Sequence, residues 1–312
     1  MPSCSVVIRA YNEAPQIVRL LEGLSRQTWA DLEVILVDSG STDSTVEQVA
    51  AVGAKVVHIL PEEFTFGRSL NLGLAAATCD LGVIASAHVY PVYPDWLERL
   101  LEPFSDPQVA LTYGKQRAPA SAHFPEQQVY QCWYPEYSDL RQAHPFCNNA
   151  NAAVRLSAWR VHPYDEVLTG LEDLAWAKWA LGEGYNIAYV AEAEIIHTHN
   201  ETRHGEYNRY RREGMAFKRI YPEAHFSLYD FARMTSANIA SDLWHALKQQ
   251  FFLKSALSIF WYRTAQFWGT YQGYRRSLAW DWNLRQTFYY PHGMEMPGRP
   301  LPREVEPIQY KG

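Results

Sequence analysis

Residues 5–13 read SVVIRAYNE and residues 33–43 read EVILVDSGSTD, and these two stretches decide the fold class. Each begins with a run of β-branched and aliphatic residues, which is typical of a strand buried on both faces. A helical pattern follows the first run: Pro15 suits a first helical turn, and Ile17, Leu20 and Leu24 come at helical spacing. Strands that alternate with helices predict a mostly parallel sheet covered by helices.

The same alternation extends outward through the first two thirds of the chain. We expect strands over residues 5–8, 33–37, 55–59, 81–86, 109–113, 187–190 and 194–198, and helices over 45–52, 69–77, 96–104 and 172–181. Residues 118–146 are rich in Pro, His and aromatic residues, which predicts a long functional loop. Beyond Gly205 the pattern is helical, and the prolines after Tyr289 indicate an extended tail.

Composition places the chain among folded, non-secreted proteins. Hydrophobic residues make up 47% and charged residues 20% of the 312 residues, which excludes general disorder. The four cysteines show neither a disulfide framework nor metal-ligand spacing. We find no signal-peptide pattern and no apolar run near the roughly 20 residues that span a bilayer. We therefore expect a soluble protein in the reducing cytoplasm.

Charge is distributed unevenly along the chain. Residues 203–285 carry 13 Lys and Arg against 6 Asp and Glu, whereas the whole chain has a net charge of -6. An acidic body with a basic, aromatic tail argues against a nucleic-acid-binding protein. Two interpretations of the tail are open. It is either an interfacial module that meets an anionic membrane surface, which would make the protein peripheral to the inner face of the cytoplasmic membrane, or a helical cap on the sheet.

Polar residues follow several of the expected strands at their carboxyl ends, where open α/β sheets bind ligands. They are Asn12, Glu13, Asp38, His88, Glu172, Asp173, His197 and His199. The first loop lacks the glycine fingerprint of a dinucleotide site, which argues against an oxidoreductase. A nucleotidyltransferase would require a glycine-rich basic phosphate loop near the amino terminus, and we find none.

Four segments, in order, resemble a known family. They are IRAYNE (8–13), VDSGSTD (37–43), FTFGRSLN (64–71) and GLED (170–173). Together they resemble glycosyltransferase family 2, the inverting group with the GT-A fold, and are most similar to its bacterial rhamnosyltransferase-like members. The resemblance covers residues 5–201. It implies an α/β GT-A nucleotide-diphospho-sugar transferase domain over 1–204, followed by a helical region over 205–288 and an extended tail over 289–312.

The resemblance also implies roles for individual residues. Asp173 would be the general base that takes a proton from the acceptor hydroxyl. Asp38 would read the nucleotide base, since a carboxylate can accept the imide N–H of uracil or thymine, and Arg68 suits an anion. The full set of implied nucleotide-binding residues is Ala10, Asn12, Glu13, Asp38, Ser39, Arg68 and Asn71. The implied donor- and acceptor-binding residues are Ala87, Lys115, Gln116, Asn149, Asn151 and Glu172.

One motif departs from the family pattern. The family carries Asp-x-Asp after the fourth strand, where its last carboxylate holds a divalent cation, but this chain has Ser86-Ala87-His88. We interpret His88 as a ligand of Mn²⁺ or Mg²⁺, completed by His199 or His197. The alternative is that these histidines donate hydrogen bonds to the leaving diphosphate without a metal. An isolated zinc site lacks a cysteine or a third nearby ligand.

The expected function is therefore transfer of a sugar, with inversion, from a UDP- or dTDP-sugar. The acceptor is a hydroxyl of a glycan or a lipid-linked acceptor in cell-surface polysaccharide synthesis. The alternative is a catalytically inactive sugar- or nucleotide-binding protein on the same scaffold, because the Asp-x-Asp motif is altered. We expect no nucleic-acid partner.

Overall fold

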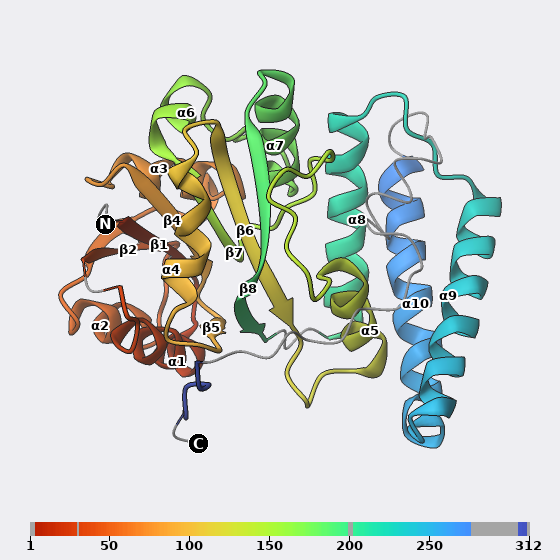
Figure 1. Cartoon of the computed structure of the whole chain (residues 1–312). Coiled ribbons are helices and arrows are strands. Elements are labelled where there is room, and N and C mark those ends of the chain that lie inside the picture. Colours follow the sequence, from red (N-terminus) through yellow and green to blue (C-terminus); the bar gives the residue numbers. More distant parts are fainter. Residues whose placement is uncertain (1–3, 30, 199–201, 276–304, 311–312) are drawn as a thin grey trace.

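The computed structural model describes residues 4–29, 31–198, 202–275 and 305–310. An α/β part built around one twisted sheet lies beside a stack of three long helices (Figure 1). The strands are β1 (Cys4–Ala10), β2 (Leu32–Asp38), β3 (Lys55–His58), β4 (Leu81–Ser86), β5 (Val89–Pro91), β6 (Val109–Arg117), β7 (Asn151–Arg155) and β8 (Asn186–His197). The helices are α1 (Ala14–Ser25), α2 (Thr45–Ala50), α3 (Phe66–Ala75), α4 (Trp96–Leu101), α5 (Phe124–Trp133), α6 (Leu156–Val161), α7 (Glu172–Gly182), α8 (Arg203–Ile220), α9 (Leu228–Lys248) and α10 (Phe252–Arg275).

The strands are arranged in the order β3-β2-β1-β4-β7-β6-β8-β5. Strands β1 to β4 run parallel to one another, and β6 and β8 share their direction because β7 is antiparallel to both β4 and β6. The short β5 is antiparallel to β8 at the sheet edge. The carboxyl ends of the parallel strands therefore meet at one edge of the sheet, which is where ligands bind in such folds.

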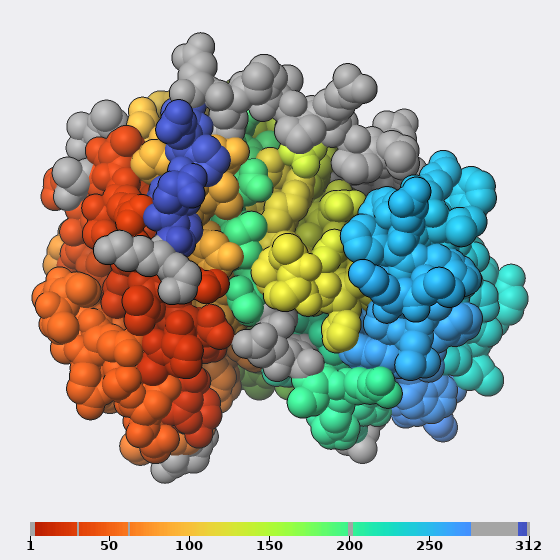
Figure 2. All heavy atoms as spheres, turned by 90° about the horizontal axis from the view of Figure 1, so that it is seen from below, coloured from red at the N-terminus to blue at the C-terminus, as the bar shows by residue number. Residues whose placement is uncertain are grey.

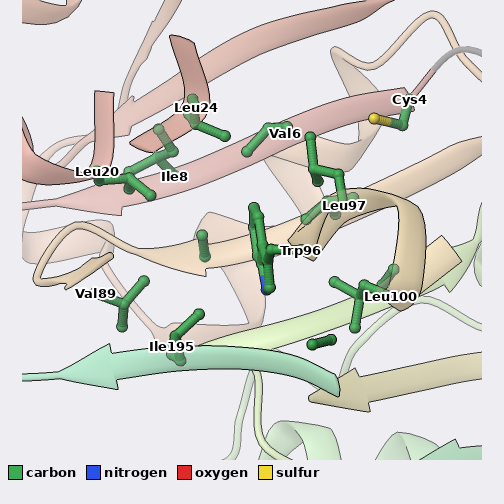
Figure 3. Close-up of a cluster of buried hydrophobic side chains, with 14 of the residues drawn as sticks. Cys4, Val6, Ile8, Leu20, Leu24, Val89, Trp96, Leu97, Leu100 and Ile195 are labelled. Atoms are coloured by element: carbon green, nitrogen blue, oxygen red, sulfur yellow. The ribbon is translucent and has the colours of Figure 1, made fainter. Parts of the chain in front are cut away.

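Alternating side chains of the central strands face two separate cores. Val6 and Ile8 of β1 face α1 and α4, whereas Val7 between them belongs to the core with α3, α6 and α7. Figure 3 shows the first of these cores, in which Trp96 of α4 lies between β1 and β8. Burial on both faces explains why these strands are nearly continuous runs of Val, Ile and Leu.

The helices α8, α9 and α10 are packed onto the α/β part through their own apolar clusters. Phe217 of α8 and Phe267 of α10 share a cluster with Leu174 of α7. A buried ion pair joins α9 to α10, with Arg263 Nε 2.7 Å from Asp242 Oδ2. The described end of the tail, residues 305–310, has no regular structure and lies against α1 and β5, where the Ile308 N–H donates to the Val92 carbonyl at 2.9 Å.

Two sequence-based expectations about secondary structure are wrong, and a third is confirmed in modified form. Residues 118–146 contain a ten-residue helix, α5, that begins at a proline-containing first turn and is held by buried Phe124 and Tyr130. Strand β7 is missing from the expected set because its sequence, NAAVR, is short and alanine-rich, and alanine has low strand propensity. The two segments expected around residues 187–198 are one strand, β8, with a register shift against β6.

The described helices include none with the length and apolar character required to cross a membrane.

Candidate active site

A cavity of about 480 Å³ lies at the carboxyl edge of the sheet. The ends of β1, β4 and β8, the segment before β7, the start of α7 and one face of α8 form its walls. Its lining residues include Arg9, Glu13, Phe66, Ser86, His88, Asn148, Asn149, Leu171, Glu172, Asp173, His197, Arg209, Arg212 and Glu213. The cavity brings together six of the described residues that the sequence predicted for the site. They are Asp173 and, with it, Glu13, His88, Asn149, Glu172 and His197.

Asp173 is held in a fixed orientation at the start of α7. Its Oδ1 accepts a hydrogen bond from the N–H of Leu174 at 2.8 Å, and its Oδ2 accepts one from the N–H of Asn149 at 3.1 Å. The preceding Leu171 adopts a left-handed conformation with φ 56°, which is strained for a residue with a branched side chain. The turn thereby places Asp173 on the cavity wall, although the residue as a whole is only 8% exposed.

Burial gives Asp173 an unusual acidity. Its pKa is raised from 3.8 to about 7. Removal from water is the largest cause and the adjacent Glu172 carboxylate adds to it, whereas the two backbone N–H donors and Arg9 act in the opposite direction. Such a group is still substantially ionised at neutral pH and is a stronger base than an ordinary aspartate. A pKa near 7 suits a group that takes up a proton at neutral pH, and this carboxylate lies on the cavity wall.

Glu172 is fixed by a second set of contacts. Its Oε1 lies 3.5 Å from an Arg9 guanidinium nitrogen and accepts a hydrogen bond from Asn149 Nδ2 at 3.3 Å. The hydroxyl of Tyr164 donates to Asn149 Oδ1 at 3.3 Å. Asn149 therefore joins the two neighbouring acids, through its backbone to Asp173 and through its side chain to Glu172.

The two described histidines of the cavity stack on each other. The ring centroids of His88 and His197 are 5.1 Å apart and the ring planes differ by 18°. Nδ1 of His88 is 2.8 Å from Glu13 Oε1, and Nδ1 of His197 is 2.8 Å from Gln116 Oε1. Because a carboxylate only accepts, His88 donates from Nδ1, and Glu13 fixes the orientation of its ring.

These histidines do not form a metal site by themselves. The lone pair of an imidazole lies in its ring plane, so two nearly parallel rings do not aim their nitrogens at one point. In the part of the chain that the structure describes, no group of three His, Cys, Asp or Glu is placed to hold a metal ion. The third predicted ligand, His199, lies outside the described residues. The described residues thus do not fit a complete cation site.

The predicted base-reading residue, Asp38, lies at the end of β2 and is only 2% exposed. Its carboxylate accepts hydrogen bonds from the N–H groups of Gly40 and Ser41 at 3.1–3.3 Å, which closes the turn that follows the strand. The N–H of Asn12 donates to Ser41 Oγ at 2.9 Å, so the loops after β1 and β2 are joined. Asp38 is not among the described residues that line the cavity, although Glu13 of the joined loop is.

Other predicted nucleotide-binding residues serve the framework around the cavity. Arg68 lies 3.5–3.6 Å from the carboxylates of Glu63 and Glu166. Asn71 donates to the Tyr164 carbonyl at 2.9 Å. Ala10 belongs to the core, and Ser39 donates its hydroxyl to the Ala10 carbonyl at 3.2 Å. Of the seven residues in this predicted set, all of them described, only Glu13 lines the cavity.

Among the residues predicted to bind donor or acceptor, Asn149 and Glu172 line the cavity and the others support it. Lys115 Nζ lies 2.8 Å from both Glu136 and Glu194. Gln116 is fully buried and orients His197. The remaining two are also fully buried: Ala87 lies in the core, and Asn151 accepts from Trp96 Nε1 at 2.9 Å.

Comparison with known proteins gives the family. The model of Glycosyl transferase family 2 matches residues 5–168, which is more than half of the chain. The chain belongs to glycosyl transferase family 2. The sequence-based family and the GT-A fold are therefore confirmed, as is the expectation of an enzyme of the glycosyltransferase class.

Relatives of this family 2 glycosyltransferase include two O-antigen enzymes. It is 28% identical to the O-antigen chain rhamnosyltransferase WbaN of Salmonella anatum over 67% of this chain and 70% of the relative. It is 26% identical to the O-antigen chain rhamnosyltransferase RfbN of Salmonella typhimurium over 66% and 69%, respectively. Among solved structures, the mannosyltransferase PcManGT of Pyrobaculum calidifontis, in complex with GDP-Man and Mn²⁺, superposes with a TM-score of 0.58 at 21% identity, covering 88% of this chain and 84% of that one. The structural likeness supports the fold.

Three arginines of this family 2 glycosyltransferase line the cavity although the sequence did not identify them as site residues. Arg9 comes from the end of β1, and Arg209 and Arg212 come from α8. The guanidinium groups of Arg9 and Arg212 lie 5.1 and 4.7 Å from the Phe66 ring centroid, so one aromatic ring supports both. The spacing of Arg209 and Arg212 places them on one helix face, which is a signal, but the pattern alone does not say what that face meets.

Proposed function

We propose that this chain transfers a sugar from a nucleotide-diphosphate donor to an acceptor hydroxyl in a single inverting displacement. The observation that carries the proposal is Asp173, a carboxylate with a pKa of about 7, oriented by two backbone N–H groups on the wall of the strand-end cavity. Asp173 accepts the hydroxyl proton as the acceptor oxygen bonds to the sugar C1. The bond from C1 to the diphosphate breaks, and its electron pair leaves with the nucleoside diphosphate.

The proposed donor is a UDP- or dTDP-sugar. Asp38, Asn12 and the joined loops after β1 and β2 would receive the nucleoside, and the diphosphate would lie in the cavity. Arg9, Arg209 and Arg212 support this part of the proposal because guanidinium groups bind phosphate oxygens in a fork geometry. Charge developing on the leaving diphosphate is then stabilised by cations that the fold already holds in place.

A divalent cation remains part of the proposal through His88 and His199. The altered Ser86-Ala87-His88 motif and the Mn²⁺ in the mannosyltransferase neighbour support testing it. Because the described residues lack a complete ligand set, we assign the cation no step. The residues that the structure describes offer arginines and imidazoles to the diphosphate instead.

The proposed pathway is cell-surface polysaccharide synthesis, with a glycan or lipid-linked acceptor. The two O-antigen rhamnosyltransferase relatives support it and make a deoxyhexose a first donor to test. We propose a cytoplasmic location at the inner face of the membrane. We also propose the division at residues 204/205, with 205–288 as a region that completes the cavity through α8 and 289–312 as a tail. Residues 276–288 of this region, and all of the tail except 305–310, lie outside the described residues.

The experiment compares release of nucleoside diphosphate from a panel of nucleotide sugars by the wild type and by Asp173→Asn. We expect the variant to bind donor normally and to lose turnover by about 10²–10⁴-fold. Glu183→Gln, at the other, exposed end of α7, is the matched control and should be fully active. If the wild type binds donors but never releases the diphosphate with any acceptor, the chain is a binding protein instead.

A further inference from the structure

The turn between α9 and α10 is a defined structure rather than a loose loop. The N–H of Phe251 donates to the Ala246 carbonyl at 2.8 Å, and the N–H of Gln250 donates to the Leu247 carbonyl at 3.2 Å. Gln250 between them is left-handed, with φ 62°. This is the Schellman pattern of a helix end, with glutamine where glycine is usual. The residues after it, Phe251-Phe252-Leu253, are therefore presented in a fixed geometry.

The tip of this helical hairpin exposes large apolar side chains. Leu253 is 95% exposed and Leu257 is 74% exposed. The exposed apolar set, which we call the hairpin tip, comprises Trp244, Leu247, Phe251, Phe252, Leu253 and Leu257, and it continues along α10 to Phe260 and Trp268. Positions 253, 257, 260 and 268 share one helix face. A hollow of about 440 Å³, lined by Leu257, Phe260, Trp268 and α8 residue Tyr207, lies beside this face.

The sequence around the tip is positively charged. Residues 243–275 contain no Asp or Glu, whereas Lys248 and Lys254 flank the apolar side chains and are exposed. The ammonium group of Lys248 lies 4.8 Å from the Trp244 ring centroid. Apolar residues flanked by lysine, with tryptophan among them, are what an interfacial helix presents to a membrane with anionic lipids.

Three of the basic residues of α8, the helix that the sequence suggested for a membrane contact, are engaged elsewhere. Lys218 is 3% exposed and donates to the carbonyls of Pro222 and Ala224. Arg209 and Arg212 line the cavity. These three cations are not available to a membrane, whereas the hairpin tip combines exposed apolar side chains with exposed lysines.

We propose that the hairpin tip docks the enzyme on a bilayer that contains anionic lipid. Leu253 and Leu257 enter the boundary between headgroups and acyl chains, and Lys248 and Lys254 contact lipid phosphates. Strands β6 and β8 end on the side of the molecule where the α9–α10 turn lies (Figure 1). Figure 2 looks onto this side, where residues near 250 (light blue) project toward the viewer. Docking by the tip thus turns the strand-end edge of the sheet, with its cavity, toward the lipid surface.

A second copy of the chain fits this surface less well. A two-fold interface would bring the same lysines of both copies together, with no carboxylate between residues 243 and 275 to offset them. An anionic lipid surface complements them, because each lysine near it contributes about a fivefold factor in affinity.

The test is co-sedimentation of the full chain with lipid vesicles, without donor or acceptor. We expect binding to vesicles of equal parts phosphatidylcholine and phosphatidylglycerol, weakened by salt, and much weaker binding to phosphatidylcholine alone. Leu253→Glu combined with Leu257→Glu should lower the partition coefficient at least about tenfold. Val161→Glu combined with Val167→Glu is the matched control: these valines are 74% and 65% exposed, receive the same charges, and should leave binding unchanged.

Each other outcome overturns the proposal. Wild-type protein that stays in the supernatant at low salt, or a tip variant that binds as well as the wild type, excludes this docking surface. Concentration-dependent dimerisation that the tip variant abolishes, without vesicle binding, assigns the surface to a second copy. Asp173→Asn should bind vesicles like the wild type, so a failure of docking and a failure of the proposed catalysis are distinguished.

Discussion

Replacing Asp173 with asparagine should make the protein inactive and, at alkaline pH, more stable. The pKa of this carboxyl rises from 3.8 to about 7 on folding, chiefly because of burial. The folded state therefore holds more protons than the unfolded state between these values. The stability that protonation provides is complete below pH 3.8 and is lost as pH rises through about 7.

The magnitude follows from the two pKa values. At 1.36 kcal/mol per pH unit, the ionised carboxylate costs the folded state about 4 kcal/mol above pH 7. Between pH 5 and pH 8, linkage removes about 2–3 kcal/mol of this stability. An amide at position 173 carries no charge, but one of the two N–H donors of Leu174 and Asn149 loses its acceptor, which costs about 1–3 kcal/mol. The free energy of unfolding of the variant should then exceed that of the wild type by about 1–3 kcal/mol at pH 8. At pH 5 the two free energies should agree within about 1–2 kcal/mol.

The assay is urea unfolding of both proteins at pH 5 and pH 8, together with the pH profile of wild-type kcat/KM. The difference in unfolding free energy should depend on pH in the stated direction. The acid limb of kcat/KM should have its midpoint near 7, since the base must be ionised in the free enzyme. A pH-independent stability difference, or an acid limb near pH 4, would refute the assignment of a buried, weakly acidic Asp173.

Three further predictions concern the cations of the site and the core. Arg212→Ala should weaken the binding of nucleoside diphosphate about tenfold in calorimetry, or by about 1.4 kcal/mol. The matched control is Arg219→Ala, at the exposed end of the same helix, which should leave the affinity unchanged. Equal affinities for Arg212→Ala and the wild type would show that Arg212 does not bind the diphosphate. Mn²⁺ should strengthen the binding of nucleoside diphosphate to the wild type but not to His88→Ala. If a chelator does not change the affinity of the wild type, no cation takes part and the arginines alone bind the diphosphate. Trp96→Ala should lower the free energy of unfolding by about 3–5 kcal/mol in denaturant titrations, because Trp96 is fully buried and donates a hydrogen bond to Asn151. A loss below about 1 kcal/mol would contradict its role in the core.

The central strands could be predicted because local sequence and tertiary burial agree there. Val6, Val7 and Ile8 favour a strand by themselves and are buried on both faces of the sheet. Strand β7 could not be predicted, because its alanines gain their extended conformation from the neighbours β4 and β6. Helix α5 could not be predicted for a related reason, because its buried side chains contact α9 and α10, which lie far away in the sequence.

The sequence predicted several of the strand ends that line the cavity, but not which side chains converge there. Asp173 and His88 reach the cavity, whereas Asp38 closes its own turn. These directions depend on loop dihedrals, such as the left-handed conformations of Asn12 and Leu171, which residue types alone do not specify. The sequence left open whether the basic, aromatic region after residue 203 is a helical cap or a membrane module. The described helices support both interpretations, because α8 lines the cavity and the hairpin tip is exposed.

The position of α8 matters for the base as well as for the donor. A bound diphosphate brings negative charge into the cavity that holds Asp173, and like charge raises the pKa of a carboxyl. Since that pKa is already about 7, a donor bound without compensating cations would keep Asp173 protonated and idle at neutral pH. Arg9, Arg209 and Arg212 oppose this effect, and two of the three belong to α8. The helix that binds the leaving group would therefore also keep the base ionised, which ties the carboxyl-terminal helices to catalysis even though Asp173 lies outside them.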